Sequence, residues 1–163
     1  MKIQILFVLS SIILSLTACG SSKKTGYTNK SKGGSYNKIE AIVKNAQSYL
    51  GTRYRTGGTT KKGMDCSGLV YTAFTNNGVS LHRTSYDMSK QGRPINTNKV
   101  QKGDLLFFKT SKSGRSINHV GVVSKVKQGD IYFIHSTTSK GVIESTLATK
   151  YWTKSFKFAK RIF

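Results

Sequence analysis

The sequence predicts an α+β fold, in which helices near the start of the folded part pack on one face of an antiparallel β-sheet of about five to six strands. Two observations carry this prediction. Apolar residues recur at helical spacing only up to Gly78, and short β-favouring runs follow one another from Asp104 onward. The 163 residues suit one domain, and no segment repeats at a fixed period.

Residues 1–18 have the composition of a secretory signal peptide. A basic start is followed by an apolar run from Ile3 to Leu16, which is too short to span a bilayer comfortably. The run closes on small residues directly before Cys19, and this arrangement resembles the lipobox of bacterial lipoproteins, whose cysteine receives a diacylglycerol. We expect Cys19 to be lipidated; the alternative is an ordinary cleavage after Ala18 that leaves Cys19 as a bystander thiol.

Residues 19–35 are rich in Ser, Lys and Gly, with one aromatic and no acidic residue. Such a segment cannot bury enough apolar surface to fold, so it predicts a flexible tether ahead of a folded domain at 36–163. The lipid would hold this domain in the cell envelope. We expect the outer membrane, on its periplasmic side, if the cell has two membranes, and otherwise the outer face of the cell membrane.

Two helices are predicted ahead of the sheet. The first starts at a capping-box pattern, Asn37 with Glu40, and ends at Gly51. The second ends at Gly78, and Asp65, Cys66 and Ser67 lie at its N-terminus. The apolar faces that indicate these helices comprise Ile39, Ile42, Val43, Ala46 and Leu50 in the first and Leu69, Val70, Ala73 and Phe74 in the second.

The predicted strands are short, apolar and rich in β-branched and aromatic residues. They are Leu105 to Phe108, Val120 to Val126, Ile131 to Ile134, Val142 to Ile143 and Phe156 to Ile162.

Cys66 is the candidate nucleophile. The chain has two cysteines, and lipidation of Cys19 leaves Cys66 as a free thiol outside the cytoplasm, where thiols are exposed to oxidation. A helix N-terminus lowers the pKa of a thiol, and its N–H groups can donate to an oxyanion. The alternative is a buried core cysteine with no chemical role.

The base must come from three histidines, His82, His119 and His135. His119 and His135 lie on neighbouring predicted strands. A three-residue loop, 127–129, with Gly129 in the left-handed conformation, would set Val126 opposite Asp130 and His135 opposite Gly121, so that both imidazoles share one face. A two-residue turn would place them on opposite faces, so the chemistry predicts the longer loop.

Two other functional classes are weaker. One cysteine and two histidines could bind zinc, but no ligands are paired at short spacing, so we expect no metal site. The formal net charge of +21 raises nucleic acid as a partner. Export, scattered basic residues and the lack of a nucleic-acid motif argue against it, and favour a solvated basic surface in an anionic envelope.

Six short motifs carry a resemblance to a known family. They are Tyr54-Arg55-Thr56-Gly57-Gly58, Asp65-Cys66-Ser67-Gly68-Leu69-Val70, Arg83-Thr84-Ser85, Gly103-Asp104-Leu105, His119-Val120-Gly121-Val122 and Phe133-Ile134-His135. Together they resemble the NlpC-type family of papain-like cell-wall peptidases, from about Asn37 to Phe163. The resemblance implies a papain-like fold and a D,L-endopeptidase that cleaves peptidoglycan stem peptides, typically after D-γ-glutamate.

The resemblance also implies residue roles. Cys66, His119 and His135 match a Cys-His-His triad. Tyr54 matches a tyrosine that assists the oxyanion or substrate, although it could simply anchor a loop. In some members the residues matching Asp65 and Ser67 bind the free amine of the stem peptide; helix capping is their structural alternative.

Two further positions lie beside the expected groove. Arg83 lines it in the family, or forms a structural ion pair. His82 replaces the proline that usually precedes Arg-Thr-Ser, and we interpret it as a loop substitution rather than a catalytic residue.

The leading hypothesis is therefore a monomeric, lipid-anchored thiol protease of peptidoglycan. It needs no cofactor, and the lipid on Cys19 is its one attached group. Its partners are stem peptides and, through the anchor, a membrane, and not nucleic acid. The alternatives are an acyltransferase or amidase on the same scaffold, since another acceptor can resolve an acyl-enzyme, and a non-catalytic wall-binding lipoprotein.

Overall fold

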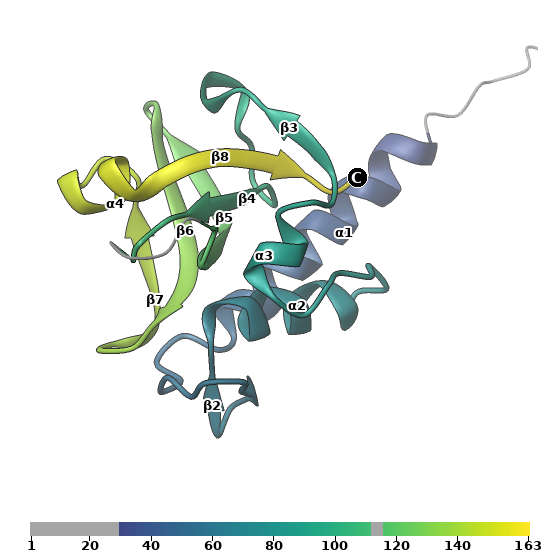
Figure 1. Ribbon diagram of the computed structural model, residues 1–163. Coiled ribbons are helices and arrows are strands. Elements are labelled where there is room, and N and C mark those ends of the chain that lie inside the picture. Colours follow the sequence, from purple (N-terminus) through teal and green to yellow (C-terminus); the bar gives the residue numbers. More distant parts are fainter. Residues whose placement is uncertain (1–29, 112–115) are drawn as a thin grey trace, which may run out of the picture.

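The computed structural model describes residues 30–111 and 116–163. The expected signal peptide, Cys19 and the first part of the expected tether lie outside these residues. Two longer helices and a short one lie beside a twisted antiparallel sheet, which confirms the α+β class (Figure 1). Within the described residues, no helix is long and apolar enough to cross a membrane.

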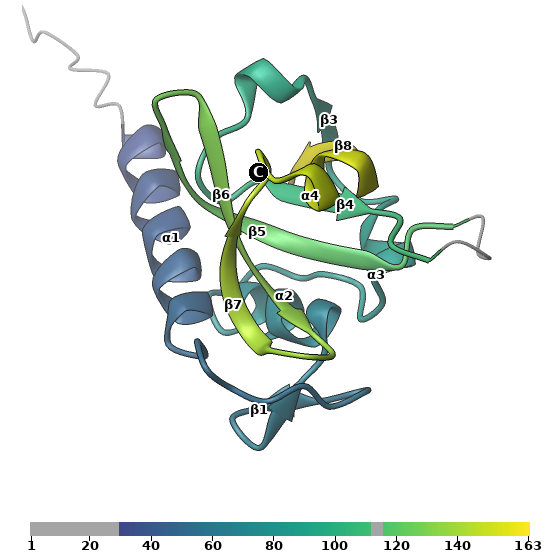
Figure 2. The same ribbon diagram turned by 90° about the vertical axis from the view of Figure 1, so that its left-hand side faces the viewer.

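The helices are α1 (Lys30–Gln47), α2 (Cys66–Thr75), the short α3 (Ser85–Met88) and α4 (Lys150–Ser155), with a 3-10 turn, η1 (Thr97–Lys99). Figure 2 shows α1 running alongside the sheet, with α2 across its lower end, while α4 stands apart at the other side. The helices thus lie on different sides of the sheet, with α4 on the side away from α1 and α2.

The main sheet has six strands in the order β3-β8-β4-β5-β6-β7, and every neighbouring pair is antiparallel. Its strands are β3 (Arg93–Ile95), β4 (Leu105–Phe108), β5 (His119–Lys127), β6 (Asp130–Thr137), β7 (Gly141–Thr146) and β8 (Phe156–Arg161). A separate small hairpin pairs β1 (Thr59–Thr60) with β2 (Gly63–Met64). The five predicted strands are confirmed, and β3 is added at one edge.

Helix α1 differs from its prediction at its start. The capping-box pattern of Asn37 and Glu40 places the first turn near residue 37, but the helix begins at Lys30, inside the segment expected to be tether. Asn37 therefore lies within the helix, and Glu40 forms an ion pair with Lys102 instead of capping. A capping pattern is short and occurs by chance, so it locates a helix end less surely than an apolar face does.

The β5–β6 connection is not the predicted three-residue loop, but His119 and His135 still share one face of the sheet, as predicted. Lys127 pairs directly with Asp130, so the turn has two residues, and Val126 lies opposite Ile131 rather than Asp130. Gln128 and Gly129 both have positive φ, 52° and 87°, as the tight primed hairpin turns require. Two-residue turns fit strongly twisted pairs of strands, which explains why this one forms.

A β-bulge then corrects the register. Val123 pairs with Phe133 and Lys125 with Tyr132, so Ser124 is an extra residue on β5. Beyond the bulge Val122 lies opposite Ile134, and continuing this register brings His135 opposite Gly121, as predicted. The bulge compensates for the shorter turn, because each shifts the register by one residue in opposite senses.

The two faces of the sheet form two hydrophobic clusters. The first packs the sheet on α1 and α2, and contains Ile42, Leu69, Phe74, Phe107 and Val122 among its fully buried members. The second, on the opposite face, is aromatic and is covered by α4; its members include Phe108, Phe133 and Trp152. The cluster on the helical side holds α2 in place, and the aromatic cluster surrounds the histidines.

Gly121→Ala tests the close packing of β5 on β6. An added Cβ would lie 2.6 Å from Phe133 Cδ2 and 3.2 Å from His135 Cβ, which forces the strands apart. We expect a loss of about 1–3 kcal/mol in the free energy of unfolding in urea. The control is Gly34→Ala in α1, where nothing lies within 4 Å of the added Cβ, and it should cost no stability. Equal stabilities of the two variants would contradict this packing.

Candidate active site

Cys66 is the first residue of α2, as predicted, and Asp65 is the N-cap. The Asp65 carboxylate accepts from the Gly68 N–H at 2.6 Å, which satisfies one of the unpaired donors at the helix start. Cys66 is 9% exposed, and its Sγ lies 4.0 Å from the carbonyl oxygen of Asn118. The nucleophile candidate is therefore nearly buried, with one face open to a pocket.

The expected lowering of the Cys66 pKa is wrong for the resting protein. Burial raises the pKa of the thiol, and the negative charge of Asp65 raises it further. Backbone N–H groups of Val120, Ser67 and Cys66 itself lower the pKa but only in part. The helix start is in place, yet desolvation of the thiolate outweighs it, so the resting sulfur is a thiol and needs a base.

His119 and His135 meet on one face of β5 and β6. His119 Nε2 lies 3.0 Å from His135 Nδ1, and the two rings are nearly perpendicular, at 84°. On the far side, His135 Nε2 lies 2.9 Å from Ser145 Oγ on β7. Because His119 uses Nε2 toward His135, its other nitrogen, Nδ1, is the one left to meet the thiol.

Burial keeps both imidazoles neutral. It lowers the pKa of His119 to about 4. It lowers the pKa of His135 to about 3, with a further contribution from a positive charge on His119. Trp152 stacks on His119 with ring centroids 5.3 Å apart and planes at 20°. A neutral imidazole has one nitrogen without a hydrogen, so His119 can accept a proton as a general base.

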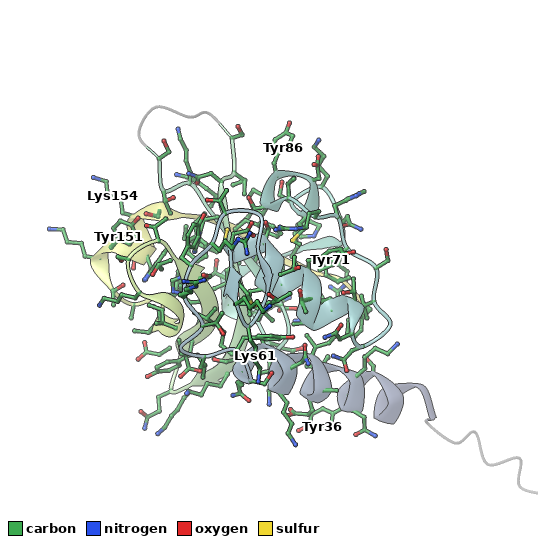
Figure 3. All side chains as sticks on the ribbon, turned by 90° about the horizontal axis from the view of Figure 1, so that it is seen from below. Tyr36, Lys61, Tyr71, Tyr86, Tyr151 and Lys154 are labelled. Carbon is green, nitrogen blue, oxygen red and sulfur yellow. The ribbon has the colours of Figure 1, made fainter. Side chains whose placement is uncertain are left out.

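A pocket of about 260 Å³ opens onto these groups. Its lining combines the nucleophile, the base and neutral hydrogen-bonding side chains: Tyr54, Cys66, Thr110, Asn118, His119, Ser136, Thr137, Thr138, Tyr151 and Trp152. Tyr151, which is labelled on α4 in Figure 3, belongs to this lining. A larger cavity of about 810 Å³ lies elsewhere, lined by residues of α1 and the C-terminus, and contains neither Cys66 nor a histidine. The smaller pocket is therefore the candidate active site.

Asp65, Ser67 and Arg83 form one ion-paired cluster. Arg83 donates to both Asp65 oxygens, at 3.0 and 2.8 Å, and to Ser67 Oγ at 2.9 Å. Burial alone would raise the pKa of Asp65, but the hydrogen bonds from Arg83, Gly68 and Ser67 and the Arg83 charge hold it below its ordinary value. Arg83 thus makes a structural ion pair, and Asp65 caps the helix.

Of the other predicted positions, Tyr54 lies at the pocket and His82 does not. Tyr54 is half-buried, pairs with Met64 through an isolated bridge and lines the pocket with Cys66. His82 is exposed on a loop, where its backbone N–H donates to Gln91 Oε1, and it does not line the pocket. Among the described residues, no group of three or more His, Cys, Asp or Glu side chains could hold a metal ion.

Several residues of the site escaped prediction, and three of them contact the catalytic groups or tie their segments together. Ser136 donates to the Met64 carbonyl at 2.8 Å, which ties the strand of His135 to the segment before Cys66. Ser145 contacts His135, and Trp152 stacks on His119. A serine in a predicted strand gives no sign that it will contact a catalytic residue. Trp152 could have been singled out, because it is the single tryptophan of the chain and such a large ring is usually buried with specific partners.

Curated proteins are similar in sequence to most of the chain. "Probable endopeptidase NlpC homolog" of Haemophilus influenzae is 40% identical over 136 residues, covering 83% of this chain and 68% of its own length. "Murein DD-endopeptidase MepS/Murein LD-carboxypeptidase" of Escherichia coli K12 is 38% identical over 115 residues, 70% of this chain. This chain spans only 57% of the length of that E. coli enzyme.

The fold is shared with solved structures as well. A crystal structure of an NlpC/P60 family protein from Bacillus cereus superposes with a TM-score of 0.68 at 28% identity, over 76% of this chain and 40% of that one. The NlpC/P60 family description matches residues 51–161, which run from the loop before Tyr54 through β8. The chain belongs to the NlpC/P60 family, a family of cysteine peptidases that hydrolyse peptidoglycan.

Proposed function

We propose that this protein is a peptidoglycan endopeptidase in which Cys66 attacks, His119 is the base and His135 orients that base. The observation that carries the proposal is that Cys66, a nearly buried thiol at a helix start, and His119 line one pocket, while His135 lies 3.0 Å from His119 on the side away from the thiol. The names of its relatives supply the substrate class.

The first step is a proton transfer. His119 Nδ1 accepts the proton of the Cys66 thiol as Sγ attacks the carbonyl carbon of the scissile bond. The imidazolium so formed is stabilised through its Nε2–H by His135 Nδ1, at 3.0 Å. The raised pKa of Cys66 supports transfer during attack over a resting thiolate–imidazolium pair.

The tetrahedral intermediate needs donors for its oxyanion. The N–H of Cys66 at the start of α2 is one candidate, and the Tyr54 hydroxyl at the pocket wall is the other. His119 then gives its proton to the leaving amine, which leaves an acyl group on Cys66. A water activated by His119 hydrolyses this acyl-enzyme and restores the free thiol.

The bond that is cut is the finer part of the proposal. The family resemblance favours the D-γ-glutamyl–diamino acid bond, whereas the E. coli relative is named for DD-endopeptidase and LD-carboxypeptidase activities. In the D-γ-glutamyl reading, a free stem-peptide amine would bind at Asp65 and Ser67. Asp65 Oδ1 already accepts from Arg83, Ser67 and the Gly68 N–H, and Oδ2 accepts from Arg83 and the Gly57 N–H. The carboxylate has no acceptor site to spare, so such an amine would have to displace one of these donors. We propose the D,L-bond with Asp65 acting mainly as the helix cap.

Digestion of purified peptidoglycan, read by mass spectrometry of the released muropeptides, tests the function. We expect new stem-peptide ends with the wild type and none with Cys66→Ala or His119→Ala, because nucleophile and base are each required. His82→Ala is the matched control, since that histidine lies outside the pocket. Exchange of the acyl group onto an added amine would favour the acyltransferase alternative, and intact substrate with retained wall binding would favour the non-catalytic one.

The acid limb of activity follows from the burial of the histidines. The pKa of His119 is lowered to about 4, so its Nδ1 can accept a proton at neutral pH. As the pH falls through about 4, His119 becomes protonated and can no longer act as a base. We expect kcat/KM for a soluble muropeptide to hold down to about pH 5 and then to fall. A midpoint near 6.5, the ordinary histidine value, would contradict this environment.

The envelope location is proposed from the lipobox-like segment that ends at Cys19. The lipid would tether the peptidase domain to a membrane within reach of the wall. Cys19→Ala should therefore move the protein from the membrane fraction to the soluble fraction and remove the lipid mass seen by mass spectrometry. Cys66→Ala is the paired control and should stay in the membrane fraction. Unchanged mass and fractionation in Cys19→Ala would contradict lipidation.

A further inference from the structure

Ser145 lies at the outer end of the line of polar groups that starts at the nucleophile. It is in β7, an edge strand paired only with β6, and it is half-buried. His135 pairs with Ile143, and Ser145 lies two residues further along, so its side chain stands on the same face as His135. Its Oγ is 2.9 Å from His135 Nε2.

The tautomers of the two histidines follow from the role of His119. To accept a proton at Nδ1, a neutral His119 must carry its own hydrogen at Nε2, and this hydrogen points at His135 Nδ1. His135 Nδ1 must then be an acceptor, which places the single hydrogen of a neutral His135 at Nε2. That N–H points at Ser145 Oγ.

We propose that Ser145 is a positioning residue of the active site: its hydroxyl accepts from His135 Nε2–H and so keeps His135 Nδ1 free to accept from His119. The inference rests on the proposed peptidase function. Without this acceptor, the other tautomer of His135 competes, in which two N–H groups face each other between the rings. His119 and His135 would then lose the hydrogen bond that holds the base.

The groups around His135 show why Ser145 selects the tautomer that carries its hydrogen at Nε2. Glu144, its neighbour, points to the opposite face and pairs with Lys125 at 2.7 Å. The titratable groups that line the pocket together with His119 are Cys66 from α2, Tyr54 and Tyr151, and His135 is not part of that lining. The rings of Phe133 and Trp152 pack against the His135 ring, with centroids 4.7 and 4.6 Å away, and carry no oxygen or nitrogen that could accept from its N–H.

Ser145→Thr and Ser145→Val separate the hydroxyl from the shape, because the two side chains are nearly isosteric and both suit a strand. We expect Ser145→Thr to keep the wild-type kcat and Ser145→Val to lose roughly three- to tenfold in kcat, with KM unchanged in both. A loss of this size corresponds to the removal of one hydrogen bond between neutral groups. Equal kcat for the two variants would overturn the proposal, because a packing role alone cannot tell them apart.

A second measurement does not depend on any substrate. Trp152 is the single tryptophan and stacks on His119, so quenching of its emission by a protonated imidazole reports the titration of the pair in the free enzyme. Ser145→Asp should raise the midpoint of this titration by about one pH unit or more over Ser145→Asn, since a carboxylate at Nε2 favours the charged form. The same midpoint in both variants would overturn the proposal.

The two readouts keep this inference distinct from the proposed function. If the protein does not cut peptidoglycan, the fluorescence titration still decides whether Ser145 faces the histidine pair. If it does cut, and kcat is equal in Ser145→Thr and Ser145→Val while the midpoint is equal in Ser145→Asp and Ser145→Asn, the peptidase proposal stands and the role of Ser145 is wrong.

Discussion

The register between β5 and β6 is the constraint on which the site depends. A strand displaced by one residue presents its side chains to the opposite face, so the 3.0 Å contact between His119 and His135 exists in only one of two registers. The two-residue turn alone would select the wrong one. The bulge at Ser124 restores the right one, and the glycine at 121 lets the strands approach closely beside the imidazoles.

The nucleophile and the base come from opposite sides of the sheet. Cys66 belongs to the cluster that packs α1 and α2 on one face, whereas the histidines lie among the aromatic residues on the other. They meet where β5 begins, at the end of the sheet, and the Ser136–Met64 hydrogen bond joins the two sides there. Each partner is therefore held by its own core, and their meeting depends on how both cores pack.

Sequence patterns predicted the elements that have a periodic apolar face or a β-favouring run, and they predicted Cys66 at a helix start. They failed where the deciding contacts lie far apart in the chain. The Ser124 bulge has no residue signature, and the six-residue α4 is too short to show a helical period. The sign of the Cys66 pKa shift was missed because burial of the thiol depends on tertiary packing, which outweighs the local effect of the helix.

Burial and the raised pKa of Cys66 also determine how its thiol reacts when no substrate is bound. Oxidants and alkylating agents react with thiolates far faster than with thiols, so the resting sulfur is a latent nucleophile. It becomes reactive only while a bound carbonyl and a neutral His119 are both beside it. In the proposed envelope location, Cys66 can thus persist without a disulfide partner, because a thiol reacts slowly with oxidants while no substrate is bound.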